Sequence, residues 1–288
     1  MERENLDVRP IMDEDADAVA MFLRDQLNPR VSLAAWGVLL APPWKVDAPN
    51  HGFQLIAGGA VVGAYVAVYA EREIDGERRR FCNLAAFCVL EEYRAHSVRL
   101  IRAMLAQRGF EFTDLSPSGN VVALNQRLGF AALDTATRVT LNLPGIPRRG
   151  VTVSGDPTII ERTLTERDAS VYRDHRGAPA ARHIVAITGD QYGYLIVRKD
   201  RRKRLPFFVS PLYVGGSRDV LRSAWREVSS HLLVRHGMPA MLAERRVLGF
   251  VPSLGVNLRT PRAKMFRSRE LPADAVDYLY SELTLLEW

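Results

Sequence analysis

The chain has 288 residues, of which 47% are hydrophobic and 25% charged, an ordinary composition for a folded globular protein. The length suffices for two domains of typical size. The acidic start lacks the basic and apolar segments of a secretory signal, and no apolar run is long enough to span a membrane. The two cysteines form no disulfide framework, and no Cys or His cluster has zinc-ligand spacing. We therefore expect a cytoplasmic protein with neither a membrane partner nor a metal site.

Positive charge is concentrated in the second half of the chain. Residues 1–150 carry 17 Lys and Arg against 18 Asp and Glu, whereas residues 151–288 carry 22 against 15. Part of the excess is the run Arg198–Arg204 (RKDRRKR). A basic half can attract nucleic acid, an anionic cofactor or an acidic partner. No nucleic-acid motif or interleaved aromatic residue accompanies the run, so we interpret it as a hairpin turn in solvent and expect no nucleic-acid partner.

Apolar periodicity and turn residues predict a mixture of strands and helices in the first half. Gly58-Gly59 between two apolar runs indicates a hairpin, and the almost unbroken apolar stretch 81–90 indicates a strand buried on both faces. The expected strands are 6–10, 53–57, 60–70, 81–90, 112–115 and 139–143, and the expected helices are 13–27, 33–40, 91–109 and 121–127. Residues 144–149 (PGIPRR) resemble a linker.

The second half repeats this order of elements with little residue identity. A hairpin around Gly189-Asp190 is followed by an apolar strand, a turn containing glycine, a long helix and a short strand. The expected elements are a polar helix at 157–174, strands at 183–188, 192–197, 205–214 and 241–243, a helix at 217–236, and a helix or strand pair at 274–286. The repetition favours an internal duplication.

A polar turn joins the buried strand 81–90 to the helix that follows it. Arg94, His96, Ser97 and Arg99 crowd this turn. The first turn of a helix presents unpaired backbone N–H groups at the positive end of the helix dipole, and arginine binds phosphate bidentately. The turn can therefore hold a phosphate or diphosphate. From the residues alone, an ordinary turn with a capping serine and solvated arginines remains the alternative.

The stretch FCNLAAFCVLEEYRAHSVRLIRAML resembles the central strand, turn and helix of the GNAT (GCN5-related N-acetyltransferase) superfamily. In that family the turn reads Arg/Gln-x-x-Gly-x-Gly/Ala, and its backbone amides hold the diphosphate of acetyl-CoA. Here Arg94 matches the leading position, while Ser97 and Arg99 replace the two glycines. Glycine allows close approach of the backbone to phosphate, so this sequence has a divergent form of the turn.

A second stretch, residues 118–130, is similar to the family's Asn-x-x-Ala-x-x-x-Tyr-x-x-x-Gly-Phe signature. Leu128-Gly129-Phe130 match it. Ser118 stands where the CoA-contacting asparagine is usual, and Asn125 stands where many members have the tyrosine that protonates the departing thiolate. Because asparagine supplies no proton, the resemblance leaves three alternatives: another acid, water, or departure of the thiolate without protonation.

The resemblance implies an α/β fold (a mixed α+β sheet arrangement) made of two tandem GNAT-like domains, each a mostly antiparallel sheet flanked by helices. Residues 1–145 would form an acyl-CoA-binding domain, and residues 150–288 a degenerate GNAT-like domain that supplies a wall of the acceptor site. In the second domain, Gly215-Gly216-Ser217-Arg218 occupies the equivalent turn. A tandem chain can build internally the pair that single-domain members form by dimerising, so monomer and homodimer both remain open.

The family's reaction implies an N-acyltransferase that uses acetyl-CoA or another acyl-CoA, with direct attack by the amine of a small molecule, amino sugar or amino acid. The cofactor positions carried over are Phe87, Cys88 and Val89 along the strand edge, Arg94, Ala95, His96, Ser97, Val98 and Arg99 in the turn, and Ser118 and Asn125. The attacking amine must be neutral, which calls for a base. The catalytic candidates are Glu71, Asn83 and His51.

Two other functions stay open. The altered turn allows a longer acyl donor, including one carried by acyl carrier protein, which the basic second half could meet. The missing tyrosine and glycines instead favour a non-catalytic acyl-CoA-binding sensor module.

Overall fold

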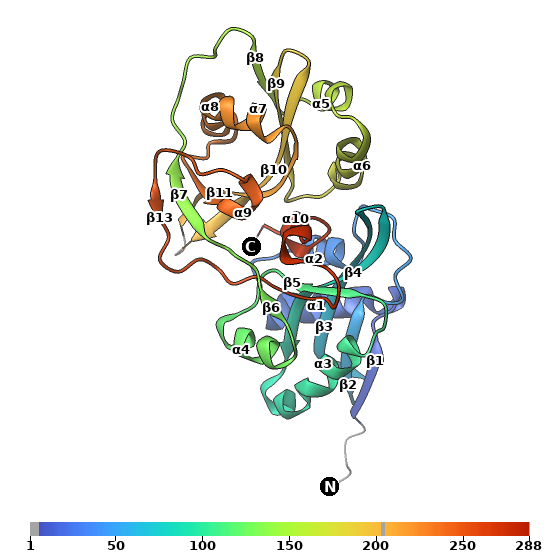
Figure 1. Cartoon of the computed structure of the whole chain (residues 1–288). Helices are drawn as coiled ribbons and strands as arrows, with labels where there is room; N and C mark the ends of the chain where they lie inside the picture. The colour runs from blue at the N-terminus through green and yellow to red at the C-terminus, as the bar shows by residue number, and fades with distance from the viewer. Residues whose placement is uncertain (1–5, 203–204, 288) are drawn as a thin grey trace. The chain divides into compact units, whose positions relative to one another are not determined.

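The computed structural model describes residues 6–202 and 205–287, and the chain divides into two compact units. Unit 1 comprises residues up to 132 together with 264–275 and 280–286, and unit 2 comprises 133–263, 276–279 and the end of the chain. Each unit contains one seven-stranded sheet (Figure 1). Within the described residues, no helix is both long and apolar enough to cross a membrane.

The sheet of unit 1 is antiparallel except for one parallel pair, β4–β5. Its strands, in spatial order, are β1 (Leu6–Pro10), β2 (Gly52–Ala57), β3 (Ala60–Ile74), β4 (Glu77–Val89), β5 (Glu111–Asp114), β14 (Met265–Arg267) and β6 (Ala131–Ala132). The expected hairpin at Gly58-Gly59 is present, because both glycines have positive φ and β2 pairs with β3 across them.

Helices cover both faces of this sheet. The core beneath α3 includes Tyr65, Ala67 and Tyr69 of β3, and the intervening residues, such as Val66 and Val68, are buried on the opposite face, where α1 and α2 pack. The helical segments are η1 (Asp13–Asp15), α1 (Ala16–Gln26), α2 (Leu33–Leu40), η2 (Glu91–His96), α3 (Ser97–Leu105), α4 (Gly119–Arg127), η3 (Ala273–Ala275) and α10 (Glu282–Leu285).

The sheet of unit 2 has a second core between its strands and the helices α7 and α8. Its strands, in spatial order, are β8 (Val151–Ser154), β9 (Arg182–Thr188), β10 (Gln191–Arg202), β11 (Leu205–Gly216), β12 (Ala240–Glu244), β7 (Thr137–Leu141) and β13 (Val256–Asn257). Its helices are α5 (Pro157–Thr163), α6 (Glu166–His175), α7 (Arg218–Ser223), α8 (Trp225–His236) and α9 (Arg245–Leu248).

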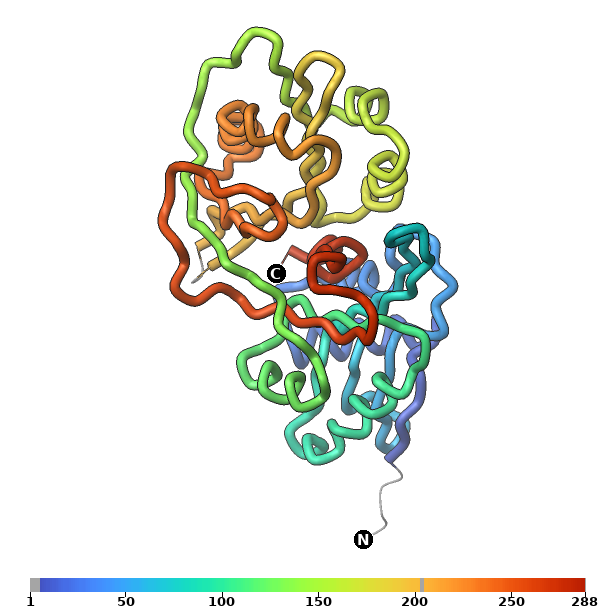
Figure 2. The backbone as a smooth tube through the Cα atoms, in the orientation of Figure 1, coloured from blue at the N-terminus to red at the C-terminus, as the bar shows by residue number. Residues whose placement is uncertain are grey.

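The two sheets have the same topology. In each, four antiparallel strands are followed by a parallel neighbour and then by two antiparallel strands. The strand in the sixth place of each sheet comes from the other end of the sequence order. β7 follows β6 of the unit 1 sheet along the chain but lies in the sheet of unit 2, and β14 follows β13 of the unit 2 sheet but lies in the sheet of unit 1. Figure 2 lets the reader follow both segments along the chain.

This exchange corrects one expectation from the sequence. The strand predicted at 139–143 as the last of the first half is β7, and it pairs with β12 and β13 of unit 2. The sheets are therefore not built from residues 1–145 and 150–288 as two uninterrupted stretches. The turn and linker residues around 144–149 mark no boundary between them. Local patterns identified the strand, but its partner is decided by contacts remote in sequence.

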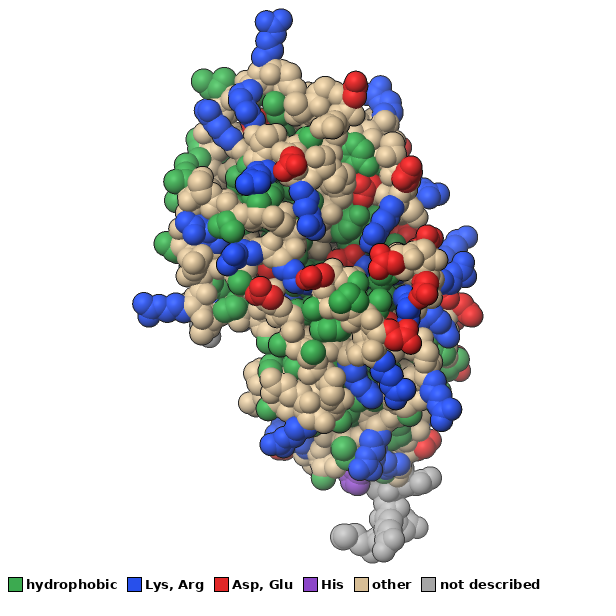
Figure 3. All heavy atoms as spheres, in the orientation of Figure 1, with side chains coloured by type: hydrophobic (Ala, Val, Ile, Leu, Met, Phe, Trp, Pro, Cys, Tyr) green, Lys and Arg blue, Asp and Glu red, His purple; other side chains and the backbone are tan. Residues whose placement is uncertain are grey.

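Several smaller expectations also change. The predicted helix at 157–174 is two helices separated at Leu164-Thr165, and the predicted helix at 217–236 breaks at Ala224 between α7 and α8. Residues 274–286 form only η3 and the single turn α10. In the basic run, Lys203 and Arg204 lie outside the described residues, while Arg198 is buried and Lys199 and Arg201 are exposed. On the face shown in Figure 3, basic and acidic side chains are interspersed.

Candidate active site

Strands β4 and β5 of unit 1 diverge and form a fork. They pair in parallel only at Phe81↔Glu111, Cys82↔Phe112 and Asn83↔Thr113. Strand β5 then ends, because Ser116-Pro117-Ser118 cannot continue a ladder, whereas β4 runs on to Val89. The β5-facing edge of β4 therefore has no strand partner beyond Asn83 among the described residues.

A β-bulge lies just inside the fork. Ala67 pairs with Leu84 and Val66 with Ala86, so Ala85 is the extra residue of β4. A bulge leaves one residue outside the ladder and re-aims the strand that carries it. Bulge and fork together expose backbone N–H and C=O groups of β4 at one place inside the unit. Phe87, Cys88 and Val89, predicted from the family resemblance, lie on this edge, and all three are half-buried.

A cluster of hydrogen-bonded polar side chains closes the narrow end of the fork. The Thr113 hydroxyl donates to Asn83 Oδ1 over 2.9 Å, and the Asn83 amide donates to the Glu282 carboxylate. The Ser116 hydroxyl donates to the other oxygen of Glu282 over 2.6 Å. Asn83 and Glu282 are buried, and α10 delivers Glu282 from the end of the chain. The side chain of Asn83, a catalytic candidate from the sequence, is therefore hydrogen-bonded to Thr113 and Glu282.

The carboxyl of Asp114 lies at the last residue of β5, on the side facing α4. The Asn125 amide donates to Asp114 Oδ2 over 2.7 Å, and both side chains are buried. Burial, with a smaller contribution from the negative charge of Glu282, raises the pKa of Asp114 to about 7 against the opposing effect of the hydrogen bonds from the Asn125 side chain and the Ser116 amide. This carboxyl can therefore hold or release a proton near neutral pH.

The helix predicted at 91–109 is divided in two: a 3₁₀ segment follows β4, and α3 then ends at Leu105. Residues Glu91–His96 form a 3₁₀ helix, so the amide of Tyr93 donates to Leu90 and that of Ser97 to Arg94. Arg94 forms an ion pair with Glu91, and Arg99 donates to the carbonyl of Leu6 over 3.1 Å. Ala95, His96 and Val98 are exposed, and α3 begins at Ser97. Within the turn, the amides available to a diphosphate are reduced to those of the first turn of α3.

Three other predicted residues lie apart from the polar cluster. Glu71 forms ion pairs across the β3–β4 hairpin with Arg78 and Arg80, and His51 Nε2 lies 2.6 Å from Asp13 Oδ1. Glu71 and His51 are thus engaged by partners other than Asn83 in the described part of the chain, and their catalytic roles stay predictions. Ser118 is the exposed N-cap residue of α4 and makes no side-chain cap bond.

Sequence reasoning missed Asp114 and Glu282. Asp114 ends a short apolar strand, and Glu282 lies in the apolar stretch that precedes Trp288. A single carboxylate within an apolar segment indicates a buried charge, and a buried charge needs a hydrogen-bond partner. This pattern could have singled out both residues. It could not reveal which partner, because Asn83 and Glu282 are 199 residues apart.

No protein-family model matches the sequence, and no curated protein matches it. Solved structures do match the fold. A GCN5-related N-acetyltransferase from Anabaena variabilis superposes with a TM-score of 0.59 at 13% identity, over 91% of this chain and 72% of that one. A putative acetyltransferase from Pyrococcus horikoshii gives 0.54 at 15% identity, over 98% and 97%.

A third similar structure is the GCN5-related glucosamine N-acetyltransferase region of a fungal multi-domain β-N-acetylglucosaminidase. Its TM-score is 0.59 at 13% identity, over 92% of this chain and 38% of that longer chain. At these identities the likeness is one of fold. The GNAT fold that the resemblance predicted is therefore confirmed, and each unit shows its mixed sheet flanked by helices.

Proposed function

We propose that the chain is an acyl-CoA-dependent N-acyltransferase that uses the fork of unit 1 to transfer an acyl group, in the first instance acetyl, to the primary amine of a small molecule. The observation that carries this proposal is the coincidence of an open strand edge with a buried carboxyl that titrates near neutral pH. The fold adds support, since the similar structures include enzymes named for N-acetyl transfer.

The donor set of the fork fits the pantetheine arm of an acyl-CoA. This arm is extended and carries amides, so it can pair with the unpartnered N–H and C=O groups of β4 between Leu84 and Val89. The diphosphate would lie at the first turn of α3, where Arg94, His96 and Arg99 contribute positive or hydrogen-bonding groups. The fit is stronger for the arm than for the diphosphate, since the 3₁₀ turn uses most of its own amides.

Within this proposal, Asp114 supplies the acid that Asn125 cannot. A neutral amine nitrogen attacks the thioester carbonyl, the carbon–sulfur bond breaks, and the proton on the Asp114 carboxyl passes to the departing sulfur. The amine nitrogen loses its extra proton as the amide forms, and that proton restores the Asp114 carboxyl. Asn125 orients the carboxyl through its bond to Oδ2. The bulge at Ala85 leaves a backbone group that can polarise the thioester carbonyl.

The test combines binding with turnover. Acetyl-CoA binding is measured by calorimetry, and thiol release is followed over a panel of amines that includes glucosamine and amino acids. We expect Asp114→Asn to retain acetyl-CoA binding while turnover falls about 10²–10⁴-fold, the usual contribution of a general acid. Absence of binding to any acyl-CoA would overturn the proposal. Unchanged turnover in Asp114→Asn would remove Asp114 from the mechanism.

One observation favours a second donor. The β4 edge suits a pantetheine arm, while the turn offers little to the diphosphate, and acyl carrier protein presents a phosphopantetheine arm without the rest of CoA. The charge excess of residues 151–288 suits an acidic carrier. Comparison of kcat/KM for acetyl-CoA and for acyl carrier protein decides between the donors, and a value at least tenfold higher with the carrier would support the second.

A further inference from the structure

The helices on the two faces of the unit 1 sheet carry opposite charge. Helices η1 and α1, on one side, contain five carboxylates and one arginine. Helices α3 and α4, which pack on one shared core on the other side, contain no carboxylate. Residues 93–110 and 115–133 hold five arginines and neither Asp nor Glu. The exposed side of α3 and α4, here called the basic surface, is therefore positive although residues 1–150 are close to neutral.

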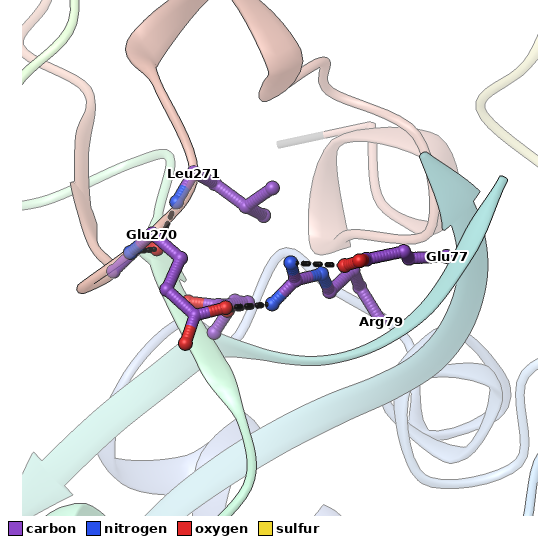
Figure 4. A network of polar contacts seen from close by, with 6 residues as sticks. Glu77, Arg79, Glu270 and Leu271 are labelled. Atoms are coloured by element: carbon purple, nitrogen blue, oxygen red, sulfur yellow. Dashed lines mark hydrogen bonds and ion pairs between the residues drawn. The ribbon is translucent and has the colours of Figure 1, made fainter. Parts of the chain in front are cut away.

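The arginines of the basic surface differ from other arginines of unit 1 in their surroundings. Arg79 of β4 is held between the carboxylates of Glu77 and Glu270 (Figure 4). Within the part of the chain that the structure describes, four exposed arginines of the basic surface form no ion pair: Arg99, Arg102, Arg108 and Arg127. The lower part of Figure 3 shows basic side chains over both helices. Such a cluster without its own carboxylates attracts an anionic partner.

The composition of the basic surface favours a protein as its partner. Val98, Arg102 and Ala106 follow one another at four-residue steps along α3, so they line one side of the helix, and all three are exposed. Val98 alone leaves 44% of its surface in solvent. Every cation of the basic surface is an arginine, and residues 93–133 contain no lysine. Protein interfaces are enriched in arginine and depleted in lysine, and they combine apolar with charged contacts.

The basic surface begins where the arm of a donor would leave the fork. Helix α3 starts at Ser97, eight residues after the end of β4, and Arg99 lies in its first turn. In the proposed function this turn receives the phosphate end of the arm. A carrier protein is covalently attached to its arm through that phosphate, so the carrier must contact whatever surrounds the turn. Arg102 lies three residues beyond Arg99, on the same side of the helix.

We propose that the basic surface of α3 and α4 docks an acidic acyl carrier protein, which presents its phosphopantetheine arm to the fork of unit 1. The inference rests on the proposed function, since it takes the fork as the place that receives the arm. The carboxylates of η1 and α1 repel an acidic carrier from the opposite face, so the charges of the two faces together orient its approach. The carrier's single phosphate also suits a turn that offers few free amides.

The test compares three donors: acetylated acyl carrier protein, acetyl-phosphopantetheine and acetyl-CoA. Acetyl-phosphopantetheine has the same arm and phosphate as the carrier but no protein, so the ratio of the two kcat/KM values isolates docking. In the natural protein we expect the carrier to exceed acetyl-phosphopantetheine about tenfold or more, within the 10–10³-fold range of electrostatic steering. The double variant Arg102→Glu/Arg108→Glu should lower kcat/KM for the carrier about tenfold and leave both other donors within about twofold.

A matched double variant separates docking from net charge. Arg24→Glu/Arg201→Glu reverses one arginine on α1 and one in the basic run of unit 2, so the net charge changes equally away from the basic surface. Its kcat/KM for the carrier should stay within about twofold, and a tenfold loss would overturn the inference. If Arg102→Glu/Arg108→Glu does not fold, salt decides with the natural protein. Between about 50 and 500 mM NaCl, kcat/KM should fall more steeply for the carrier than for acetyl-phosphopantetheine, and equal slopes would overturn the inference.

Binding measured without turnover distinguishes this inference from the proposed function. Calorimetry with the apo carrier, which lacks the arm, should show binding to the natural protein that weakens about tenfold in Arg102→Glu/Arg108→Glu. Carrier binding with no turnover of any donor would support the docking surface and reject the N-acyltransferase. Turnover of acetyl-CoA without any binding of the carrier would do the reverse. Binding to duplex DNA or to anionic lipid vesicles as tight as to the carrier would make the basic surface a general anion-binding face and overturn the inference.

Discussion

Unit 2 has a fork of its own, and comparing it with the fork of unit 1 separates what the fold provides from what the side chains provide. Strands β11 and β12 pair only at Phe208↔Ala240 and Val209↔Met241, and β11 then runs on to Gly216. Leu212 is the extra residue of its bulge, as Ala85 is in unit 1. The open edge and the bulge therefore occur twice in one chain.

The side chains around the second fork differ at every position that matters in the first. By register, Ala243 takes the place of Asp114, and the carboxyl that ends β12 is that of Glu244, one residue further on, which is buried and accepts a hydrogen bond from the Tyr278 hydroxyl. A second buried carboxyl is Asp168 of α6, which accepts hydrogen bonds from Tyr213 over 2.7 Å and Tyr192 over 3.0 Å. Its side chain packs against Gly215, where a Cβ would come within 2.1 Å of it.

The turn that follows the strand differs as well. In unit 2 the Ser217 side chain caps the amide of Val220 and α7 begins at once, whereas unit 1 has a 3₁₀ segment before α3. The comparison shows that the fold supplies an open edge in both units, and that the two units place different polar side chains beside it, with the carboxyl at Asp114 in the first and one residue further along, at Glu244, in the second. We therefore expect chemistry in unit 1 alone.

The largest expected effect is on turnover. Asp114→Asn should lower kcat about 10²–10⁴-fold, whereas Asp168→Asn, its counterpart in unit 2, should leave kcat within about threefold. Asp168 is bonded to two tyrosines and lies outside the proposed site. Steady-state thiol release checks both variants, with circular dichroism as the control for folding. A large loss in Asp168→Asn and none in Asp114→Asn would reverse the assignment of the two units.

The second prediction concerns the opposite pH dependence of stability in the two units. Burial raises the pKa of Asp114 to about 7, above about 3.9 in the unfolded chain. The folded state then holds a proton that the unfolded chain releases, so the contribution present below pH 4 is lost as the pH rises through about 7. The loss is at most about 4 kcal/mol. Asp114→Asn should abolish it.

In unit 2 the sign is reversed. Burial lowers the pKa of His183 to about 4, below about 6.5 in the unfolded chain. Here the unfolded chain binds the proton first, so stability is lost as the pH falls from about 6.5 toward 4, by at most about 3 kcal/mol. Urea unfolding of the natural protein, Asp114→Asn and His183→Gln at pH 4.5, 6 and 8, monitored by amide exchange in each unit, measures both slopes. The same slope in both units would contradict this pair of predictions.

The third prediction compares equivalent positions on the two open edges, Gly215 in unit 2 and Cys88 in unit 1. Gly215→Ala should destabilise the protein by about 1–3 kcal/mol, because the added methyl group overlaps Asp168. Cys88→Ala should cost less than about 1.5 kcal/mol, because the side chain is only half-buried and becomes smaller. Chemical denaturation measures both changes, and a greater cost for Cys88→Ala would show that the two edges are packed differently from this description.

The smallest effect is local. On addition of saturating CoA, amide hydrogen exchange in residues 84–90 should slow about tenfold, corresponding to about 1.4 kcal/mol of added protection, because the arm would pair with that edge. The equivalent residues 211–217 should exchange at an unchanged rate. Protection at 211–217 instead would place the donor in unit 2.

Local patterns predicted much of the fold and part of the site. The apolar run 81–90, the hairpin at Gly58-Gly59 and the helix at 33–40 follow from residues close in sequence, and the structure has all three. The sequence placed Phe87–Val89 on a strand and singled out Asn83 as a polar residue in an apolar run. The sequence could not predict which part of β4 lacks a strand partner, since that depends on where the pairing between β4 and β5 ends.

The remaining features depend on residues that are distant along the chain. From the sequence, Asn125 is only the replacement of a tyrosine, and the structure adds that its amide donates to Asp114. From the sequence, Asn83 is a catalytic candidate, and the structure adds that its amide donates to Glu282. The 3₁₀ form of residues 91–96 was also not evident, because Glu-Glu-Tyr-Arg suits an open turn and a short helix equally. Burial and pairing of a polar side chain are tertiary properties.

The exchanged strands have a consequence for synthesis on the ribosome. Residues 6–132 emerge first, but their sheet is incomplete until β14 and α10 have also emerged, about 130–150 residues later. At typical rates of about 5–20 residues per second this leaves a delay of roughly six to thirty seconds, during which β5 has an unpaired edge. In unit 2, β7 is translated before every other strand of its sheet. The sheet whose first strands are translated first is therefore the sheet that is completed last.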